Sequence, residues 1–155
     1  MGVTFNANEV FEMAKQIEIN GGAFYRKAAE NATEGKDLLL EIAAQEDEHL
    51  EAFTELQTEL SARETEPSAF DPNDEGELYL KAMAGGKVFD IKKDPAETLK
   101  GTESLNEILK IAIGMEKDSI IFYLGIKEMV SPKLGEDKVI KEEMKHIRWL
   151  SEKTK

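Results

Sequence analysis

The chain contains no cysteine among its 155 residues. This absence excludes disulfides, thiolate metal ligands, iron–sulfur clusters and cysteine nucleophiles within the chain. Basic residues are also scarce, because 20 Lys and Arg stand against 32 Asp and Glu and leave a formal net charge of -12. Nucleic acids and anionic membranes both bind basic surfaces, so we expect neither of them as a partner.

Long apolar runs are missing as well. No stretch approaches the roughly 18 apolar residues of a membrane-spanning helix, and residues 1 to 8 lack the apolar run of a signal peptide. We therefore expect a cytoplasmic protein. The length suits a single domain over residues 1 to 155. Strand-type alternation is scarce and helix-forming residues are abundant, which predicts an all-α fold.

Four amphipathic segments are predicted to form long helices. Two of the helix starts resemble capping boxes, in which Asn6 pairs with Glu9 and Ser104 pairs with Glu107. The predicted helices cover about residues 8 to 32, 37 to 61, 104 to 130 and 136 to 152.

The segment between the second and third helices has a different composition. Residues 62 to 102 are richer in Pro, Gly and Asp, and so long a connection in a compact domain normally carries structure of its own. We expect a crossover that carries a short helix at about residues 73 to 84. Asp94-Pro95 is predicted to begin one further turn, which Gly101 closes.

The chain has only two histidines, and each follows a glutamate by three residues. Glu46 precedes His49, and Glu143 precedes His146. On a helix this spacing places both side chains of a pair on one face, one turn apart. Both pairs lie among the apolar positions of predicted helices, so a metal site is the leading hypothesis. The alternative is that the histidines are surface or core residues near unrelated glutamates.

The two halves of the chain repeat one pattern. Glu18 and Tyr25 correspond to Glu116 and Tyr123 at a shift of 98 residues, and the two Glu-x-x-His motifs correspond at a shift of 97. In each half the predicted turn lies midway between the first glutamate and the histidine. An antiparallel helical hairpin therefore places them at the same height. Two such hairpins, packed face to face, would bring four glutamates and two histidines together.

Four carboxylates in an apolar core are unfavourable unless cations pair with them. Two divalent ions would balance their charge, with one imidazole, one terminal carboxylate and two bridging carboxylates for each ion. This oxygen-rich set favours iron or manganese, with zinc as a further alternative, and it matches the ligand pattern of ferritin-like di-iron proteins. The predicted metal ligands are Glu18, Glu46, His49, Glu116, Glu143 and His146.

These ligands, together with Tyr25, Tyr123 and the segment of residues 113 to 120, resemble the rubrerythrin-like branch of the ferritin-like di-iron carboxylate superfamily. The resemblance covers essentially the whole chain. It implies an antiparallel four-helix bundle with a long crossover, a centre of two iron ions that reacts with hydrogen peroxide or oxygen, and a homodimer. It also implies that the six ligands are catalytic and that the two tyrosines hydrogen-bond to ligating carboxylates. The simpler alternative is that the tyrosines are core aromatics.

Two departures from rubrerythrins bear on the activity. Rubrerythrins carry a rubredoxin domain with four cysteines, whereas this chain has none, so a separate electron-donor protein would be needed. Ser119 stands where rubrerythrins have an extra glutamate, and neighbouring Asp118 is a candidate for a partial substitute. An iron-storage protein with ferroxidase-like chemistry therefore remains an alternative, as does a metal-binding structural bundle without turnover.

Gly21 and Gly22 interrupt the first predicted helix. Each glycine lowers helix stability by about 1 kcal/mol relative to alanine, so the pair calls for an explanation. The two glycines would either allow close contact between helices or leave space for a substrate beside the metals.

Overall fold

Four long α-helices make up most of the computed structural model, which describes residues 7–59, 78–79, 82, 94–129 and 136–154. No strand occurs in these ranges, and the predicted all-α class is confirmed. The helices begin and end within two residues of the predicted boundaries that fall inside the described ranges. They are α1 (Ala7–Asn31), α2 (Lys36–Glu59), α4 (Leu105–Met129) and α5 (Glu136–Lys153), with a short 3₁₀ helix, η1 (Pro95–Thr98), before α4.

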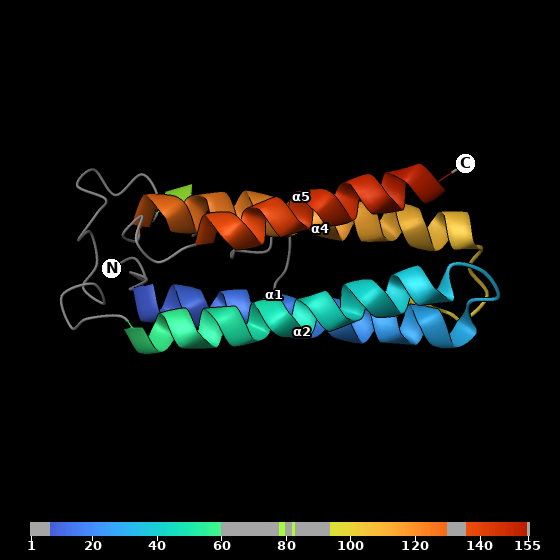
Figure 1. The fold of residues 1–155 in the computed structure, drawn as a ribbon, viewed down its shortest axis with the longest axis horizontal. Helices are drawn as coiled ribbons and strands as arrows, with labels where there is room; N and C mark the ends of the chain where they lie inside the picture. The colour runs from blue at the N-terminus through green and yellow to red at the C-terminus, as the bar shows by residue number, and fades with distance from the viewer. Residues whose placement is uncertain (1–6, 60–77, 80–81, 83–93, 130–135, 155) are drawn as a thin grey trace.

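The long helices form two antiparallel hairpins that lie along one another (Figure 1). The first hairpin consists of α1 and α2, and the second consists of α4 and α5. The hairpins meet with α1 beside α4 and α2 beside α5. The predicted antiparallel four-helix bundle, with a long connection between its second and third long helices, is therefore confirmed.

Local signals account for the helix ends that the structure describes. At the start of α4, the Ser104 backbone N–H donates to Glu107 Oε2 at 2.8 Å, and the Glu107 backbone N–H donates to Ser104 Oγ at 3.2 Å. This reciprocal capping box is the predicted one. Between α1 and α2, Gly35 has a φ of 72°, a left-handed conformation that glycine adopts without steric cost. The predicted pairing of Asn6 with Glu9 lies outside the described residues.

The crossover is described only in part. Asp94 caps η1, since its side chain accepts a hydrogen bond from the Ala96 backbone N–H at 2.9 Å, and Gly101 after it has a φ of 88°. The predicted turn in this segment is thus present. Most of the predicted helix at residues 73 to 84 lies outside the described residues. The three residues of this range that the structure describes are helical, namely Leu78, Tyr79 and Ala82.

The core consists of two apolar clusters with a polar layer between them. Along α1, Val10 to Ala14 belong to one cluster and Phe24 to Ala29 to the other, and Glu18 lies between these stretches. In each of the other three long helices, the buried glutamates and histidines likewise lie between residues of the two clusters. The fold therefore holds the polar layer at mid-height, closed off at both ends by packed side chains.

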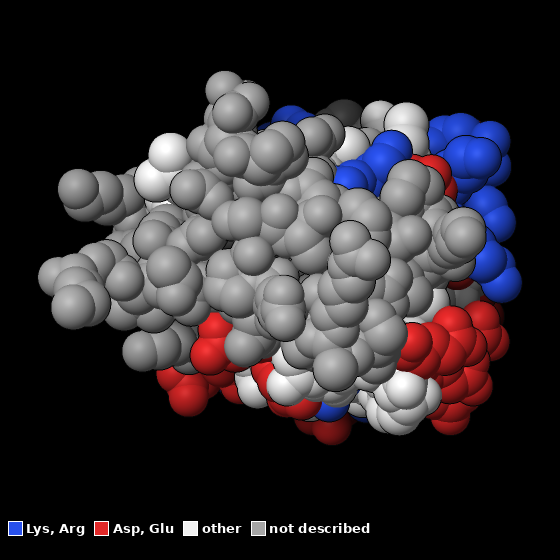
Figure 2. All heavy atoms as spheres, turned by 90° about the vertical axis from the view of Figure 1, so that its left-hand side faces the viewer, with Lys and Arg blue, Asp and Glu red and all other residues white. Residues whose placement is uncertain are grey.

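The surface charge is divided between the hairpins. Helix α2 carries eight acidic residues and one lysine, whereas α5 balances five acidic residues with five Lys and Arg. Figure 2 views the end of the bundle where α2 ends, and there acidic side chains gather mainly on the side of the first hairpin. Among the described long helices, acidic residues are therefore most numerous on α2. Each described helix is too short or too polar to cross a lipid bilayer.

Candidate metal centre

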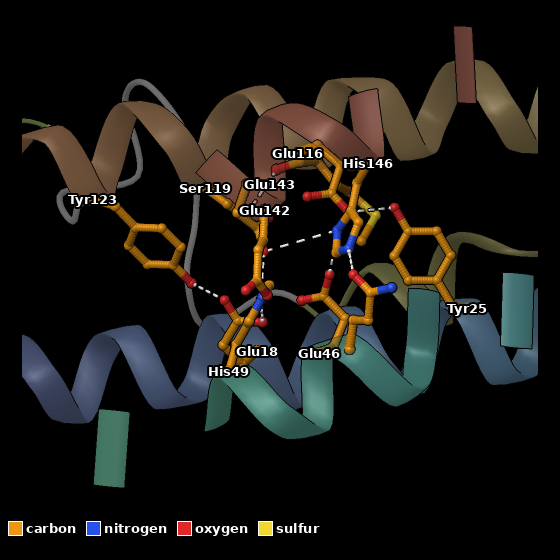
Figure 3. Close-up of polar contacts among 12 residues, drawn as sticks. Glu18, Tyr25, Glu46, His49, Glu116, Ser119, Tyr123, Glu142, Glu143 and His146 are labelled. Atoms are coloured by element: carbon orange, nitrogen blue, oxygen red, sulfur yellow. Dashed lines mark hydrogen bonds and ion pairs between the residues drawn. The ribbon is translucent and has the colours of Figure 1, made fainter. Parts of the chain in front are cut away.

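The structure brings all six predicted ligands together in the polar layer. One comes from α1, two from α2, one from α4 and two from α5, so every long helix takes part (Figure 3). None of these side chains is more than 3% exposed, which is unusual for ionisable groups unless they are paired. The six residues are Glu18, Glu46, His49, Glu116, Glu143 and His146.

These residues form two overlapping groups, each of which could hold one metal ion. Within each group the candidate ligand atoms all lie within 4.8 Å of one another. Glu46 and Glu143 belong to both groups, as bridging carboxylates would. We call the first group the His49 position and the second the His146 position; they consist of Glu18, Glu46, His49 and Glu143, and of Glu46, Glu116, Glu143 and His146.

Polar atoms without hydrogen-bond partners face the middle of this layer. Each such buried atom costs on the order of 1–3 kcal/mol unless something pairs with it. His49 Nδ1 lies 2.8 Å from Glu143 Oε1, and His146 Nδ1 lies 3.3 Å from Glu46 Oε1, yet all four atoms lack a hydrogen bond. Together with unpaired oxygens of Glu18, Glu116 and Glu143, they form a donor set that fits divalent cations.

The outer nitrogen of each imidazole ring is held by the opposite hairpin. His49 Nε2 donates to Glu142 Oε2 at 2.6 Å, and His146 Nε2 donates to Gln45 Oε1 at 2.8 Å. In the neutral ring, an Nε2 proton donated to these acceptors leaves the Nδ1 lone pair facing the metal layer. Gln45 and Glu142 are not among the predicted site residues, although each directly precedes the glutamate of a Glu-x-x-His motif.

Both tyrosines of the repeat donate hydrogen bonds to candidate ligands across the bundle. Tyr25 Oη donates to Glu116 Oε1 at 2.6 Å, and Tyr123 Oη donates to Glu18 Oε1 at 2.5 Å. Burial, followed by repulsion from the nearby carboxylates, raises the pKa of both phenols well above 10.0. The phenols therefore keep their protons near neutral pH and act as donors that orient the two terminal carboxylates.

Protons are distributed unevenly over the carboxylates. Burial and repulsion from neighbouring carboxylates raise the pKa values of Glu46 and Glu143 well above 4.5. Burial also acts to raise the pKa of Glu116, but the adjacent Glu143 and His146 side chains and the hydrogen bond from Tyr25 outweigh burial and lower that pKa. The two shared carboxyl groups therefore keep protons to higher pH than Glu116 does, and cation binding would compete with those protons.

Gly21 makes room beside one of the shared carboxylates. A Cβ atom on Gly21 would lie 3.1 Å from Glu46 Oε2, so this glycine allows α1 to approach the α2 glutamate closely. Of the two explanations for the glycine pair, this contact favours close helix packing. Ser119 is buried, and its hydroxyl donates to the Met115 carbonyl at 3.0 Å. Neither Ser119 nor half-buried Asp118 belongs to a ligand group of the described residues.

The hairpins divide the centre in a regular way. In each ligand group, three members come from one hairpin and the fourth, a shared glutamate, comes from the other hairpin. Four hydrogen bonds orient the ligands from outside the metal layer, two donated by tyrosines and two donated by histidines, and all four join the two hairpins. The geometry of each metal position is therefore set by the docking of one hairpin against the other.

Comparison with known proteins gives a likeness at the level of fold. The chain matches no protein-family model and no curated protein. It is similar to a crystal structure of a Thermotoga maritima protein assigned as ferritin-like diiron-carboxylate, with 27% identity and a TM-score of 0.74. The match covers 98% of this chain and 96% of that one. The fold is therefore ferritin-like, and the buried groups are compatible with a di-iron site.

Proposed function

We propose that this chain holds two iron ions between its hairpins and acts as a non-haem di-iron oxidoreductase on hydrogen peroxide or oxygen. The observation that carries the proposal is the pair of overlapping ligand groups, which share two glutamates and are buried among unpaired polar atoms. A cluster of this kind destabilises the fold unless cations neutralise it. The di-iron assignment of the similar Thermotoga maritima protein agrees with this choice of metal.

The protein residues would have three tasks in this function. The Nδ1 atoms of His49 and His146 and the four carboxylates would bind the ions, and the shared Glu46 and Glu143 would bridge them. The tyrosines and the outer histidine contacts would fix the orientation of these ligands. The apolar clusters would keep bulk water out. When bound, iron would supply a ferrous–ferric couple and a Lewis acid toward an O–O bond.

Turnover needs a reductant that the chain itself does not provide. It has no cysteine and hence no iron–sulfur centre or rubredoxin-type site of its own. We therefore propose that a separate electron-donor protein delivers electrons, and that the chemistry is of the rubrerythrin type. The competing function is iron storage, in which iron is oxidised and held without a dedicated reductant.

The test is iron loading followed by a redox cycle. Metal-free protein is loaded anaerobically with ferrous iron, its iron content is measured, and its absorption spectrum is recorded before and after peroxide. We expect two irons per chain, one for each ligand group, and a ferric absorption that a reductant removes over repeated cycles. Less than one iron per chain, or a spectrum that never responds to peroxide, would overturn the proposal. Uptake far beyond two irons would favour storage.

A double variant provides the control for this test. Glu46→Ala with Glu143→Ala removes both shared carboxylates, and stoichiometric iron binding should be lost. A single exposed glutamate of α2, changed in Glu51→Ala, serves as the matched control, which should bind iron as the wild type does. If the double variant still bound two irons, the ligand assignment would be wrong.

A further inference from the structure

The two halves of the centre differ in the acceptor that holds the outer nitrogen of each histidine. Gln45 and Glu142 occupy equivalent places in the repeat, since they are 97 residues apart and each precedes its Glu-x-x-His motif. His49 Nε2 donates to the Glu142 carboxylate (Figure 3), whereas His146 Nε2 donates to the Gln45 amide oxygen. One histidine therefore has a charged acceptor and the other a neutral one.

The hydrogen bonds to the terminal carboxylates match between the halves. The halves also differ in an uncharged contact, since the Trp149 ring lies 5.8 Å from the His146 ring, whereas the equivalent residue of the first half is Ala52. Each position combines one histidine, one terminal glutamate and the same two shared glutamates. Tyr25 and Tyr123 donate to the two terminal carboxylates at 2.6 and 2.5 Å, and each comes from the opposite hairpin. The two phenol contacts are thus equivalent, and they give no reason for one metal position to differ from the other.

A carboxylate acceptor changes the donor strength of an imidazole. A charge-assisted hydrogen bond draws the Nε2 proton outward, which increases the electron density at Nδ1 and makes it a stronger metal ligand. The Glu142 carboxylate also adds a negative charge next to the His49 position, whereas Gln45 adds none to the His146 position. Replacing such an outer partner typically changes metal affinity by about 10- to 100-fold.

We propose that the two metal positions are inequivalent and that the His49 position binds a divalent cation more tightly than the His146 position. The inference rests on the proposed function only in requiring that metal binds at all. The Glu142 side chain is 23% exposed, so water screens part of its charge. The difference in affinity should therefore lie near the lower end of the range, at about tenfold. Glu142 acts as a positioning and tuning residue, because it touches a ligand rather than the ion.

Manganese(II) alone is a suitable probe, because it can be located by its anomalous scattering. Metal-free protein is crystallised with one equivalent of Mn²⁺ per chain, and the occupancies of the two positions are compared. The wild type is compared with Glu142→Gln, which keeps a hydrogen-bond acceptor but removes its charge. The exchange variant Gln45→Glu with Glu142→Gln moves that charge to the other half of the repeat. Calorimetric titration with Mn²⁺ in solution gives the two dissociation constants for each protein.

We expect Mn²⁺ to bind about tenfold more tightly to the His49 position than to the His146 position in the wild type. In Glu142→Gln the two affinities should be nearly equal, and in the exchange variant the His146 position should bind more tightly. Equal occupancy in the wild type would overturn the inference, as would a His49 preference that survives the exchange, and both would leave the proposed function standing. Failure of the wild type to bind Mn²⁺ or ferrous iron at either position would overturn the proposed function and this inference together.

Discussion

Replacing Glu143 with leucine should stabilise the metal-free protein and remove its capacity to hold two cations. Glu143 is fully buried, and neither of its carboxylate oxygens has a hydrogen-bond partner. Burial, then repulsion from Glu116 and Glu18, raises its pKa well above 4.5. Without metal, the side chain is therefore a source of instability at mid-height in the bundle.

The expected change in the free energy of unfolding follows from the removal of a buried polar group. A buried polar group without partners costs about 1–3 kcal/mol. Replacing buried ionic groups by well-packed apolar ones often stabilises a protein by about 1–4 kcal/mol. We therefore expect the free energy of unfolding of metal-free Glu143→Leu to exceed that of the metal-free wild type by about 1–4 kcal/mol. For a chain of this length each kcal/mol corresponds to about 2–4 °C in Tm.

The assay is urea unfolding at pH 7 in the presence of a chelator, followed by circular dichroism, with metal binding measured separately on chelator-free protein. Glu51→Leu on the exposed face of α2 is the control, and its stability should change by no more than about 0.5 kcal/mol. A metal-free Glu143→Leu protein that is less stable than the wild type would refute the reasoning about unpaired carboxylates. A variant that still binds two cations would refute the role of Glu143 as a shared ligand.

Two further predictions concern pH and helix packing. The metal-free protein should lose stability as pH rises from about 4.5 through the folded-state pKa values of Glu46 and Glu143, because the folded state retains protons that the unfolded chain releases. Thermal unfolding in chelator measures this trend, and a Tm that increases over that window would contradict it. Gly21→Ala should weaken Mn²⁺ binding, because its Cβ would lie 3.1 Å from Glu46 Oε2 and press on a shared ligand. The matched control is Gly114→Ala, whose Cβ meets nothing within 4 Å; it should gain about 1 kcal/mol of stability and bind Mn²⁺ unchanged.

The fold and the meeting of the six candidate ligands were predictable because the signals for them are local. Helical periodicity marks the buried faces, and the reciprocal pairing of Ser104 with Glu107 marks the start of α4. The three-residue spacing within Glu-x-x-His places each pair on one face. The position of each turn midway between a glutamate and its histidine then fixes their relative height. Whether these residues bind metal stays a prediction.

The contacts between hairpins were not predictable in the same way. Gln45 and Glu142 are both adjacent to motif glutamates, but no local pattern states which histidine each would reach. The partner depends on how far the hairpins are rotated and offset when they dock, and that is decided by the packing of both apolar clusters at once. For the same reason the sequence did not reveal which carboxylate each tyrosine would contact, nor that Gly21 lies against Glu46.

The covalent link between the two hairpins has a consequence for how such a centre can change over generations. Two identical hairpins that associated as separate molecules would carry the same residue beside both histidines, because one gene would encode both copies. In this chain, the connection between α2 and α4 joins two hairpins that are encoded separately. A substitution can therefore alter one metal position and leave its counterpart as it was, as the different residues at 45 and 142 illustrate.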